Sequence, residues 1–347
     1  MPPLRIATFN CENLYVYHRL REKDIRFDND NEIEDVGFDR PGVPITSLER
    51  GWRIERAQRH ATARGIISRQ PDIIALQEVE SLDVLNRFLS DFVNKKEIPD
   101  LRKIYGNEKE KVKWRFDYRI VIDGNDNHKI DVALLSRFPI RNIRTHFWEK
   151  IPGTITDYFP RDCLEADVEL PNGKIITFLV NHFTSRGSDS TGEKRTRQAQ
   201  RVVEILKERF GQNLDRGNFV VCGDLNDEPT NDSLRTTLYD PSLNLINPIG
   251  ALPEDQQWTH FWYYDSGTPR PEPFAQLDHI LLSPSFKEGN ETPHVEMDRR
   301  GLLRTFIQEV GDDFPIEKAF RKVSETPGTE GSDHCSVFVD VNTENLV

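Results

Sequence analysis

The 347-residue chain has few cysteines and no long apolar segment. Its four cysteines are widely spaced and include no C-x-x-C pair, which argues against a zinc site or a disulfide framework. We expect all four to be small, buried hydrophobic side chains: Cys11, Cys163, Cys222 and Cys335. No apolar run approaches the roughly 18 residues that a transmembrane helix needs. No basic segment followed by an apolar stretch opens the chain, so we expect a cytoplasmic protein, or a secreted one whose leader has been trimmed.

The chain is also poor in positive charge. It carries 46 lysines and arginines against 58 aspartates and glutamates, for a formal net charge of −12. This balance argues against a generally basic surface for nucleic acid. Metal ions can nevertheless bridge a carboxylate site to an anionic substrate. Affinity for a polyanion would then depend on a metal together with a local basic patch.

Internal repeats and long low-complexity linkers are absent from the sequence, which favours one domain over residues 1–347. Two stretches without clear periodicity, near 18–50 and 290–330, are interpreted as loop insertions. The first contains a series of aspartates and glutamates, but the spacing of a calcium-binding EF-hand loop is missing. We therefore expect a solvated surface loop there.

Alternating short strands and amphipathic helices dominate the rest of the chain. Pro171-Asn172-Gly173 between two apolar runs is a strong hairpin signal. Strands that arrive in hairpins, with helices between them, predict an α/β fold of two mixed sheets packed face to face with helices outside. Strands are expected near 4–9, 72–76, 115–122, 130–135, 142–148, 163–170, 174–180, 218–222, 276–282 and 336–341, and helices near 52–68, 82–92, 193–210 and 231–238.

Short polar motifs recur at the ends of these apolar runs. Side chains placed at the same ends of several strands would converge in one cleft. Carboxylate and amide oxygens suit a hard divalent cation, and histidine can donate a proton near neutral pH. The motifs, which together look like a metal-dependent phosphoesterase site, are Phe9-Asn10, Gln77-Glu78, Asn181-His182, Gly223-Asp224-Leu225-Asn226, Leu277-Asp278-His279 and Ser332-Asp333-His334.

The order and spacing of these motifs resemble the endonuclease/exonuclease/phosphatase superfamily, from about Leu4 to Val339. The resemblance implies a four-layered α/β sandwich and a Mg²⁺ cofactor, with Mn²⁺ or Ca²⁺ as possible substitutes. It gives Glu78 the role of principal metal ligand. Asn10 would support the metal or orient its ligands, and Asp333 could reach the metal.

The resemblance also implies catalytic roles. Asp224 would orient or deprotonate the attacking water, and Asn226 would hold phosphoryl oxygens or a metal-bound water. His182 and His334 would face the phosphate from two sides. Asp278 would hydrogen-bond His334, which fixes the tautomer and orientation of its imidazole.

Three arginines are candidate substrate contacts. Arg161 matches a family position that contacts phosphate, and a guanidinium suits that role. Arg186 and Arg195 belong to a basic stretch after His182, for which a solvated helix face is an equal alternative. An aromatic run, 258–264, is interpreted as core rather than as a base-stacking surface.

Our leading interpretation is a metal-dependent nuclease that hydrolyses DNA or RNA with little sequence specificity. The Trp-x-Asp-Arg pattern of phosphoinositide phosphatases is missing at 276–279, as is the aromatic-Arg-Leu-Asp-Tyr pattern of abasic-site enzymes. The motifs around Asn10 and His182 look instead like bacterial proteins of the superfamily identified as predicted nucleases. A phosphomonoesterase or a lipid-headgroup phosphodiesterase is the enzymatic alternative. A non-catalytic binding module is disfavoured, because no acid, amide or histidine of the set is missing.

Overall fold

A computed structural model describes residues 3–14, 56–93, 114–126, 130–261, 274–287, 292–299, 331–344 and 346. The predicted loop at 18–50 and most of the one at 290–330 lie outside these residues. The loop interpretation is wrong for His294–Asp298, which forms a strand that pairs with Ser336–Val341. The main elements, in chain order, are β1 (Leu4–Leu14), α1 (Arg56–Ile67), β2 (Ile73–Val79), α2 (Leu82–Phe88), the π-helical segment η2 (Leu89–Val93), β3 (Tyr118–Ile122), β4 (Asp131–Ser136), β5 (Ile140–Arg144), β6 (Cys163–Glu169), β7 (Ile175–His182), α4 (Glu193–Phe210), β8 (Phe219–Asp224), α5 (Asp232–Arg235), β9 (His260–Phe261), β10 (Phe274–Ala275), β11 (Asp278–Leu282), β12 (His294–Asp298) and β13 (Ser336–Val341).

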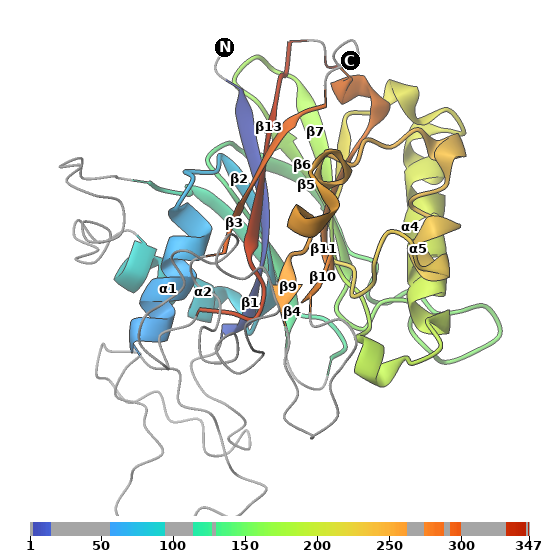
Figure 1. Cartoon of the computed structure of the whole chain (residues 1–347), viewed down its shortest axis with the longest axis horizontal. Coiled ribbons are helices and arrows are strands. Elements are labelled where there is room, and N and C mark those ends of the chain that lie inside the picture. The colour runs from blue at the N-terminus through green and yellow to red at the C-terminus, as the bar shows by residue number, and fades with distance from the viewer. Residues whose placement is uncertain are drawn as a thin grey trace, which may run out of the picture.

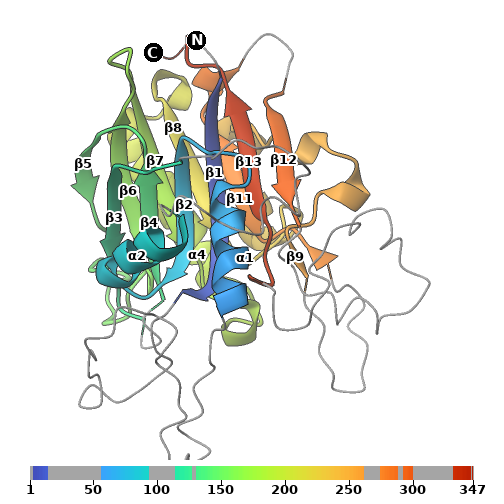
Figure 2. The same ribbon diagram turned by 90° about the vertical axis from the view of Figure 1, so that its left-hand side faces the viewer.

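Two mixed sheets form the centre of the molecule (Figures 1 and 2). The strand order is β12-β13-β1-β2-β4-β3 in the first sheet and β11-β8-β7-β6-β5 in the second. β1 and β2 are parallel, as are β7 and β8, whereas the other neighbours in the two sheets are antiparallel. The predicted pair of mixed sheets is confirmed.

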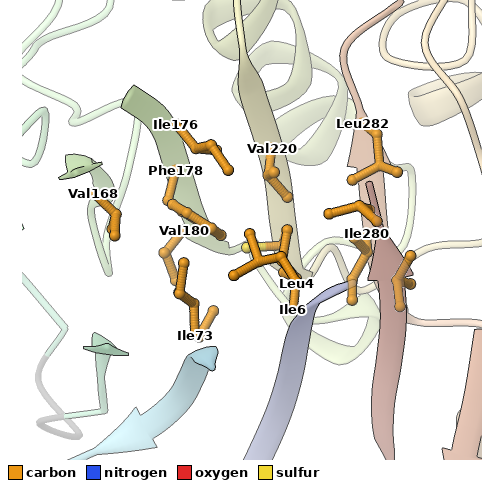
Figure 3. Close-up of a cluster of buried hydrophobic side chains, with 14 of the residues drawn as sticks. Leu4, Ile6, Ile73, Val168, Ile176, Phe178, Val180, Val220, Ile280 and Leu282 are labelled. Carbon is orange, nitrogen blue, oxygen red and sulfur yellow. The ribbon is translucent and has the colours of Figure 1, made fainter. Parts of the chain in front are cut away.

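Side chains that alternate along the strands separate the core into layers. Ile6 and Ile73 point from the first sheet into the space between the sheets, where they meet Phe178 and Val220 from the second sheet (Figure 3). The next residues along the strands, such as Ala7, face the opposite side. This period of two is what two-sided burial of a strand requires.

Helices cover the outer face of each sheet, which completes the predicted four-layered sandwich (Figures 1 and 2). α1 and α2 pack on the first sheet. On the second sheet, α4 buries Ala199, Val202 and Leu206, which recur at helical spacing. The predicted bounds of α4 are confirmed, and the four cysteines are free and buried, as predicted. Among the described residues, no helix combines the length and apolarity needed to cross a membrane.

One predicted strand is displaced. We expected a strand at 142–148, but β5 spans Ile140–Arg144. The backbone N–H of His146 donates to the carboxylate of Asp162 at 2.6 Å instead of to a neighbouring strand. The chain therefore leaves the sheet where these polar partners replace the ladder.

The parallel pairs explain where polar residues gather. Because β1 and β2 run in the same direction, Asn10 and Glu78 lie at the same edge of the first sheet. His182 and Asp224 are likewise register partners at the ends of β7 and β8. A hydrogen bond between Asn10 and Asp224 joins the two edges. One edge of the sandwich thus receives polar residues from both sheets.

Candidate active site

One carboxylate oxygen forms the centre of the site. Asp224 Oδ2 accepts hydrogen bonds from Asn10 Nδ2 at 3.0 Å and Asn226 Nδ2 at 3.1 Å. The same oxygen lies 3.4 Å from His182 Nε2 and 3.8 Å from His334 Nε2. All five residues are buried. The structure therefore brings two amides and two imidazoles together around Asp224, and the five residues come from four segments of the chain.

The backbone at Asp224 requires glycine on one side and a left-handed residue on the other. Gly223 has φ of +128°, and a Cβ at this position would lie 1.9 Å from the carbonyl oxygen of Asn181. Asn226 has φ of 53°, and its backbone N–H donates to Asp224 Oδ1 at 2.8 Å. Glycine allows β8 to approach β7 closely, and asparagine tolerates the left-handed conformation. The Gly-Asp-Leu-Asn motif therefore supplies the backbone conformations that this turn requires, as well as the polar side chains of the site.

Glu78 enters the site through an irregularity in its strand. The register of β2 with β4 shifts between Gln77 and Val79. Glu78 occupies this bulge with φ of 63°. A bulge interrupts the alternation of side chains and redirects the residue that it contains. Glu78 Oε1 consequently accepts from Asn10 Nδ2 at 3.3 Å and lies 3.9 Å from His182 Nε2.

A buried aspartate holds the second histidine. His334 Nδ1 is 2.7 Å from Asp278 Oδ2, with Asp278 completely buried. The carboxylate makes Nδ1 the protonated nitrogen, so Nε2 faces Asp224. The hydroxyl of Thr259 in turn accepts the backbone N–H groups of Leu277 and Asp278, at 3.0 and 2.9 Å. The predicted Asp278–His334 contact is present in the structure.

Burial and charge set unequal protonation tendencies for the site residues. Burial, followed by the charge of Arg161, lowers the pKa of His182 well below its usual value. Burial also lowers the pKa of His334, but the carboxylates of Asp278 and Asp224 outweigh it and raise this pKa well above its usual value. The site therefore pairs a neutral imidazole with one that favours its protonated form.

Two carboxyl groups of the site, those of Asp224 and Glu78, have raised pKa values. Burial raises the pKa of Asp224 to about 6. Burial, followed by the charge of Asp333, raises the pKa of Glu78 to about 7. Carboxylates held close together in a desolvated site repel one another. A bound cation would relieve this repulsion, and carboxylate oxygens such as those of Glu78 are the donors that a hard divalent ion prefers.

The side chain of Asn10 links the two carboxylates of the site. Its Nδ2 reaches both Glu78 and Asp224, and its Oδ1 accepts the backbone N–H of Glu12 at 3.0 Å. The amide thus fixes the separation of two carboxylates. The role of orienting metal ligands that was expected for Asn10 stays a prediction.

The three predicted substrate arginines differ in their surroundings. Arg161 is buried, with Nη1 donating to the carbonyl oxygen of Phe183 at 2.9 Å and Nε donating to Asp126 at 2.8 Å. Its charge is felt by Glu78 and His182. Arg161 is therefore next to the centre of the site.

Arg195 is 4% exposed, and its Nε donates to Asp227 Oδ2 at 2.9 Å. Its guanidinium is used inside the fold, so it does not join the other site residues. Arg186 keeps 38% of its side chain exposed and pairs with Asp227 and Glu228 at 3.1 and 3.4 Å. Of the two, Arg186 alone offers a surface to a substrate.

Sequence patterns missed His260. This residue lies in the two-residue strand β9 and forms an isolated bridge with His334. Its Nε2 is 3.5 Å from Asp333 Oδ2, and its ring lies 4.6 Å from that of His334, centroid to centroid. In both views β9 lies in the lower half of the molecule (Figures 1 and 2). A two-residue strand has no periodicity to detect, and His260 was hidden in the aromatic run 258–264, of which Trp258 and Phe261 are buried as predicted.

A sequence model described as "Endonuclease/Exonuclease/phosphatase family" matches residues 7–334. The chain belongs to this family. Enzymes of the endonuclease/exonuclease/phosphatase family are hydrolases that act on phosphoesters and are generally dependent on divalent metals. No curated protein sequence matches the chain significantly.

Solved structures of the endonuclease/exonuclease/phosphatase family share the fold at low identity. A Bacteroides vulgatus member is 15% identical, with a TM-score of 0.55 and coverage of 99% of this chain and 100% of that one. The human Nocturnin catalytic domain with bound sulfate is 16% identical, with a TM-score of 0.52 and coverage of 99% and 95%. D. rerio TDP2 complexed with single-strand DNA product is 14% identical, with a TM-score of 0.54 and coverage of 98% and 99%.

Proposed function

We propose that the protein is a divalent-metal-dependent phosphodiesterase that hydrolyses DNA or RNA with low sequence specificity. The observation that carries this proposal is the convergence of two imidazoles, from His182 and His334, on the carboxylate of Asp224. Hydrolysis of a phosphodiester requires an activated water, stabilisation of the phosphate charge and protonation of the leaving oxygen. The site offers one candidate group for each requirement.

Asp224 is our candidate for activating water. It is buried, and its Oδ2 is the point on which the amides and imidazoles converge. A carboxylate with a pKa near 6 accepts a proton more readily than an ordinary aspartate and is still ionised at neutral pH. Asn226 fixes the orientation of this carboxylate through its backbone and side-chain N–H groups.

His334 is our candidate for donating a proton to the leaving oxygen. Asp278 holds its Nδ1–H, and the surrounding carboxylates favour the imidazolium. His182 stays neutral on the other side of Asp224 and could donate one hydrogen bond to a phosphoryl oxygen. Arg161, next to these groups, would contact the phosphate with its remaining N–H donors.

Glu78, with support from Asn10 and Asp333, would hold the metal ion, which we propose is Mg²⁺ in the native enzyme. Such an ion supplies charge neutralisation at the phosphate when bound. Glu78 is the best-placed ligand because the bulge at φ of 63° directs its carboxylate toward Asn10 and His182. A non-glycine residue in this conformation is costly and tends to be retained at functional sites.

Nucleic acid is proposed as the substrate because TDP2, a similar fold, is named as a complex with single-strand DNA product, and because the motifs resemble predicted nucleases. The test is a panel of plasmid DNA, single-stranded RNA, a chromogenic phosphodiester and a phosphomonoester, each with Mg²⁺, Mn²⁺, Ca²⁺ or chelator. We expect metal-dependent cleavage of a nucleic acid. Cleavage of the small esters alone would reject nuclease activity and leave the headgroup esterase alternative, and activity that survives the chelator would reject the metal role.

A further inference from the structure

We infer that His260, Asp333 and His334 form a second metal site, specific for a borderline transition-metal ion such as Zn²⁺. It shares Asp333 with the oxygen-donor site at Glu78 but adds two imidazole donors. His260 Nε2 is 3.5 Å from Asp333 Oδ2, and His334 Nε2 is 3.8 Å from Asp333 Oδ1. One donor atom from each residue lies within 4.8 Å of the others. Among the described residues, no other group of three or more possible ligands meets this criterion.

The spacing of the three side chains suits coordination of one ion. Zinc binds imidazole nitrogen and carboxylate oxygen at about 2.0–2.2 Å, so neighbouring ligands of a tetrahedral site lie roughly 3.4 Å apart. His260 Nε2 lies 3.5 Å from Asp333 Oδ2, His334 Nε2 lies 3.8 Å from the other oxygen, Oδ1, and one donor atom of each residue lies within 4.8 Å of the others. Side-chain movements of about 1 Å would bring the three donors to the separations of a tetrahedral site. Three protein ligands leave a fourth position for water or a substrate oxygen.

The donor set differs from that at Glu78. Two imidazoles and one carboxylate favour zinc and similar ions, whereas Mg²⁺ prefers oxygen ligands. Asp278 completes the arrangement, since it binds Nδ1 of His334 at 2.7 Å and leaves Nε2 to face Asp333. A carboxylate behind a coordinating histidine is the usual outer partner in zinc sites, where it fixes the tautomer and strengthens the ligand.

The backbone holds the two ligand segments together without any metal. The N–H of Phe261 donates to the carbonyl oxygen of Asp333 at 3.0 Å, and the N–H of Cys335 donates to that of Thr259 at 2.7 Å. These bonds place His260 opposite His334 in an isolated bridge. Metal binding would therefore order few additional groups, which lowers its entropic cost.

The expected effect of Zn²⁺ on hydrolysis rests on the proposed function. Zn²⁺ on His334 Nε2 would occupy the nitrogen that we assign to proton donation. The ion would therefore inhibit Mg²⁺-supported hydrolysis, and Glu78 would not be needed for its binding.

Co²⁺ is the probe that tests the site directly, because its visible spectrum distinguishes imidazole-bound four- or five-coordinate ions from pale, oxygen-bound six-coordinate ones. We expect intense visible bands at one equivalent of Co²⁺ in the wild-type chain, which Zn²⁺ abolishes and Mg²⁺ does not. Glu78→Gln should keep these bands. His260→Gln should lose them, and Asp278→Asn should weaken affinity by about 10–100-fold.

His294→Gln is the matched control. His294 also faces an aspartate, Asp340 at 3.6 Å, but it lies on the surface, and among the described residues it forms no metal-ligand group with a second histidine. The control should retain the bands. Only pale six-coordinate absorption in the wild type, or unchanged bands in His260→Gln, would overturn the inference. If His260→Gln does not fold, imidazole ¹⁵N shifts of the wild-type chain decide: Zn²⁺ should shift the resonances of His260 and His334, and their failure to move would reject the site. None of these outcomes depends on whether the protein cleaves nucleic acid.

Discussion

The molecule contains two buried clusters of acids and histidines, which differ in the positively charged partners of their carboxylates. At the site, Asp224, Asp278 and Asp333 face histidines, and in the described part of the chain no arginine or lysine lies within ion-pair distance of them. Beneath α4, by contrast, Glu165 lies beside arginine side chains. Buried acids therefore occur with arginine partners in one cluster and with histidine partners in the other.

The cluster beneath α4 is an internal set of ion pairs. Arg209 contacts both Glu165 and Asp167, and Arg201 donates to Glu149 at 2.6 Å. His146 joins Glu149 and Glu165 at 2.7 and 3.2 Å. Here opposite charges offset the cost of burying each carboxylate. At Asp224 no arginine or lysine of the described residues forms an ion pair, and the facing positive charge is that of the His334 imidazolium, whose Nε2 lies 3.8 Å from Oδ2. Such incomplete compensation is the condition expected where a cation and a substrate phosphate are to bind.

The strongest test of this contrast is Asp224→Asn. If Asp224 activates water, turnover should fall by roughly two to four orders of magnitude, the usual scale for a lost proton-transfer group. The fold should survive, because an amide removes a poorly compensated buried charge. Turnover and urea unfolding of the same preparation would check both parts. Near-normal turnover would exclude the role of Asp224, and loss of folding would show that the carboxylate is structural.

A histidine bonded to uncharged groups sharpens the comparison. The ring nitrogens of His279 contact the Tyr239 hydroxyl at 2.6 Å and the Asp227 carbonyl oxygen at 2.9 Å. Burial lowers the pKa of His279 from 6.5 to about 4. The unfolded chain therefore binds the extra proton first as the pH falls, so the stabilisation is complete above pH 6.5 and is lost between 6.5 and 4.

The expected loss is about 3 kcal/mol across that window, since one pKa unit corresponds to about 1.4 kcal/mol. It would be measured as the free energy of unfolding in urea at several pH values. His279→Gln should remove this part of the pH dependence. An identical pH slope in wild type and variant would contradict a neutral, buried His279.

Removing one acid beneath α4 should have the reverse signature of Asp224→Asn. Glu165 is buried and faces Arg209, so Glu165→Gln leaves a guanidinium with fewer partners. We expect the free energy of unfolding to fall by about 2 kcal/mol, less than for a fully buried pair because Arg209 keeps some contact with water. Turnover per folded molecule should stay at the wild-type level. A large loss of turnover without destabilisation would break the distinction between the clusters.

Sequence reasoning could predict that these polar residues converge, because they occupy strand ends. Asn10, His182 and Asp224 each close an apolar run, and parallel pairing then puts them at one edge. The strand topology alone is therefore enough to predict that these side chains converge. The bulge that turns Glu78 inward could not be predicted, since a register shift depends on the partner strand.

The sequence carries a signal for the burial of Arg195. Arg195 lies four residues before Ala199 and seven before Val202, on the apolar face of α4. Helical spacing therefore argued for an inward arginine with an acidic partner, which the structure supplies as Asp227. His260 is different, because its contact with Asp333 joins segments more than 70 residues apart and leaves no local pattern.

The smallest expected effect concerns Arg186, the exposed arginine of the basic stretch. Asp227 and Glu228 already compensate part of its charge, so a phosphate contact through it should contribute less than about 1 kcal/mol. Arg186→Gln should raise the Michaelis constant for long DNA by a few-fold and reduce the salt dependence of binding by about one unit of slope. Hydrolysis of a small chromogenic diester should not change.

Arg141→Gln is the matched control, because Arg141 is also exposed and paired with an acid, Glu169 at 2.6 Å, but lies at the opposite end of β6 from the site. Equal effects of the two substitutions on DNA would mean that only overall charge matters, and no effect of Arg186→Gln would place the substrate backbone elsewhere on the molecule.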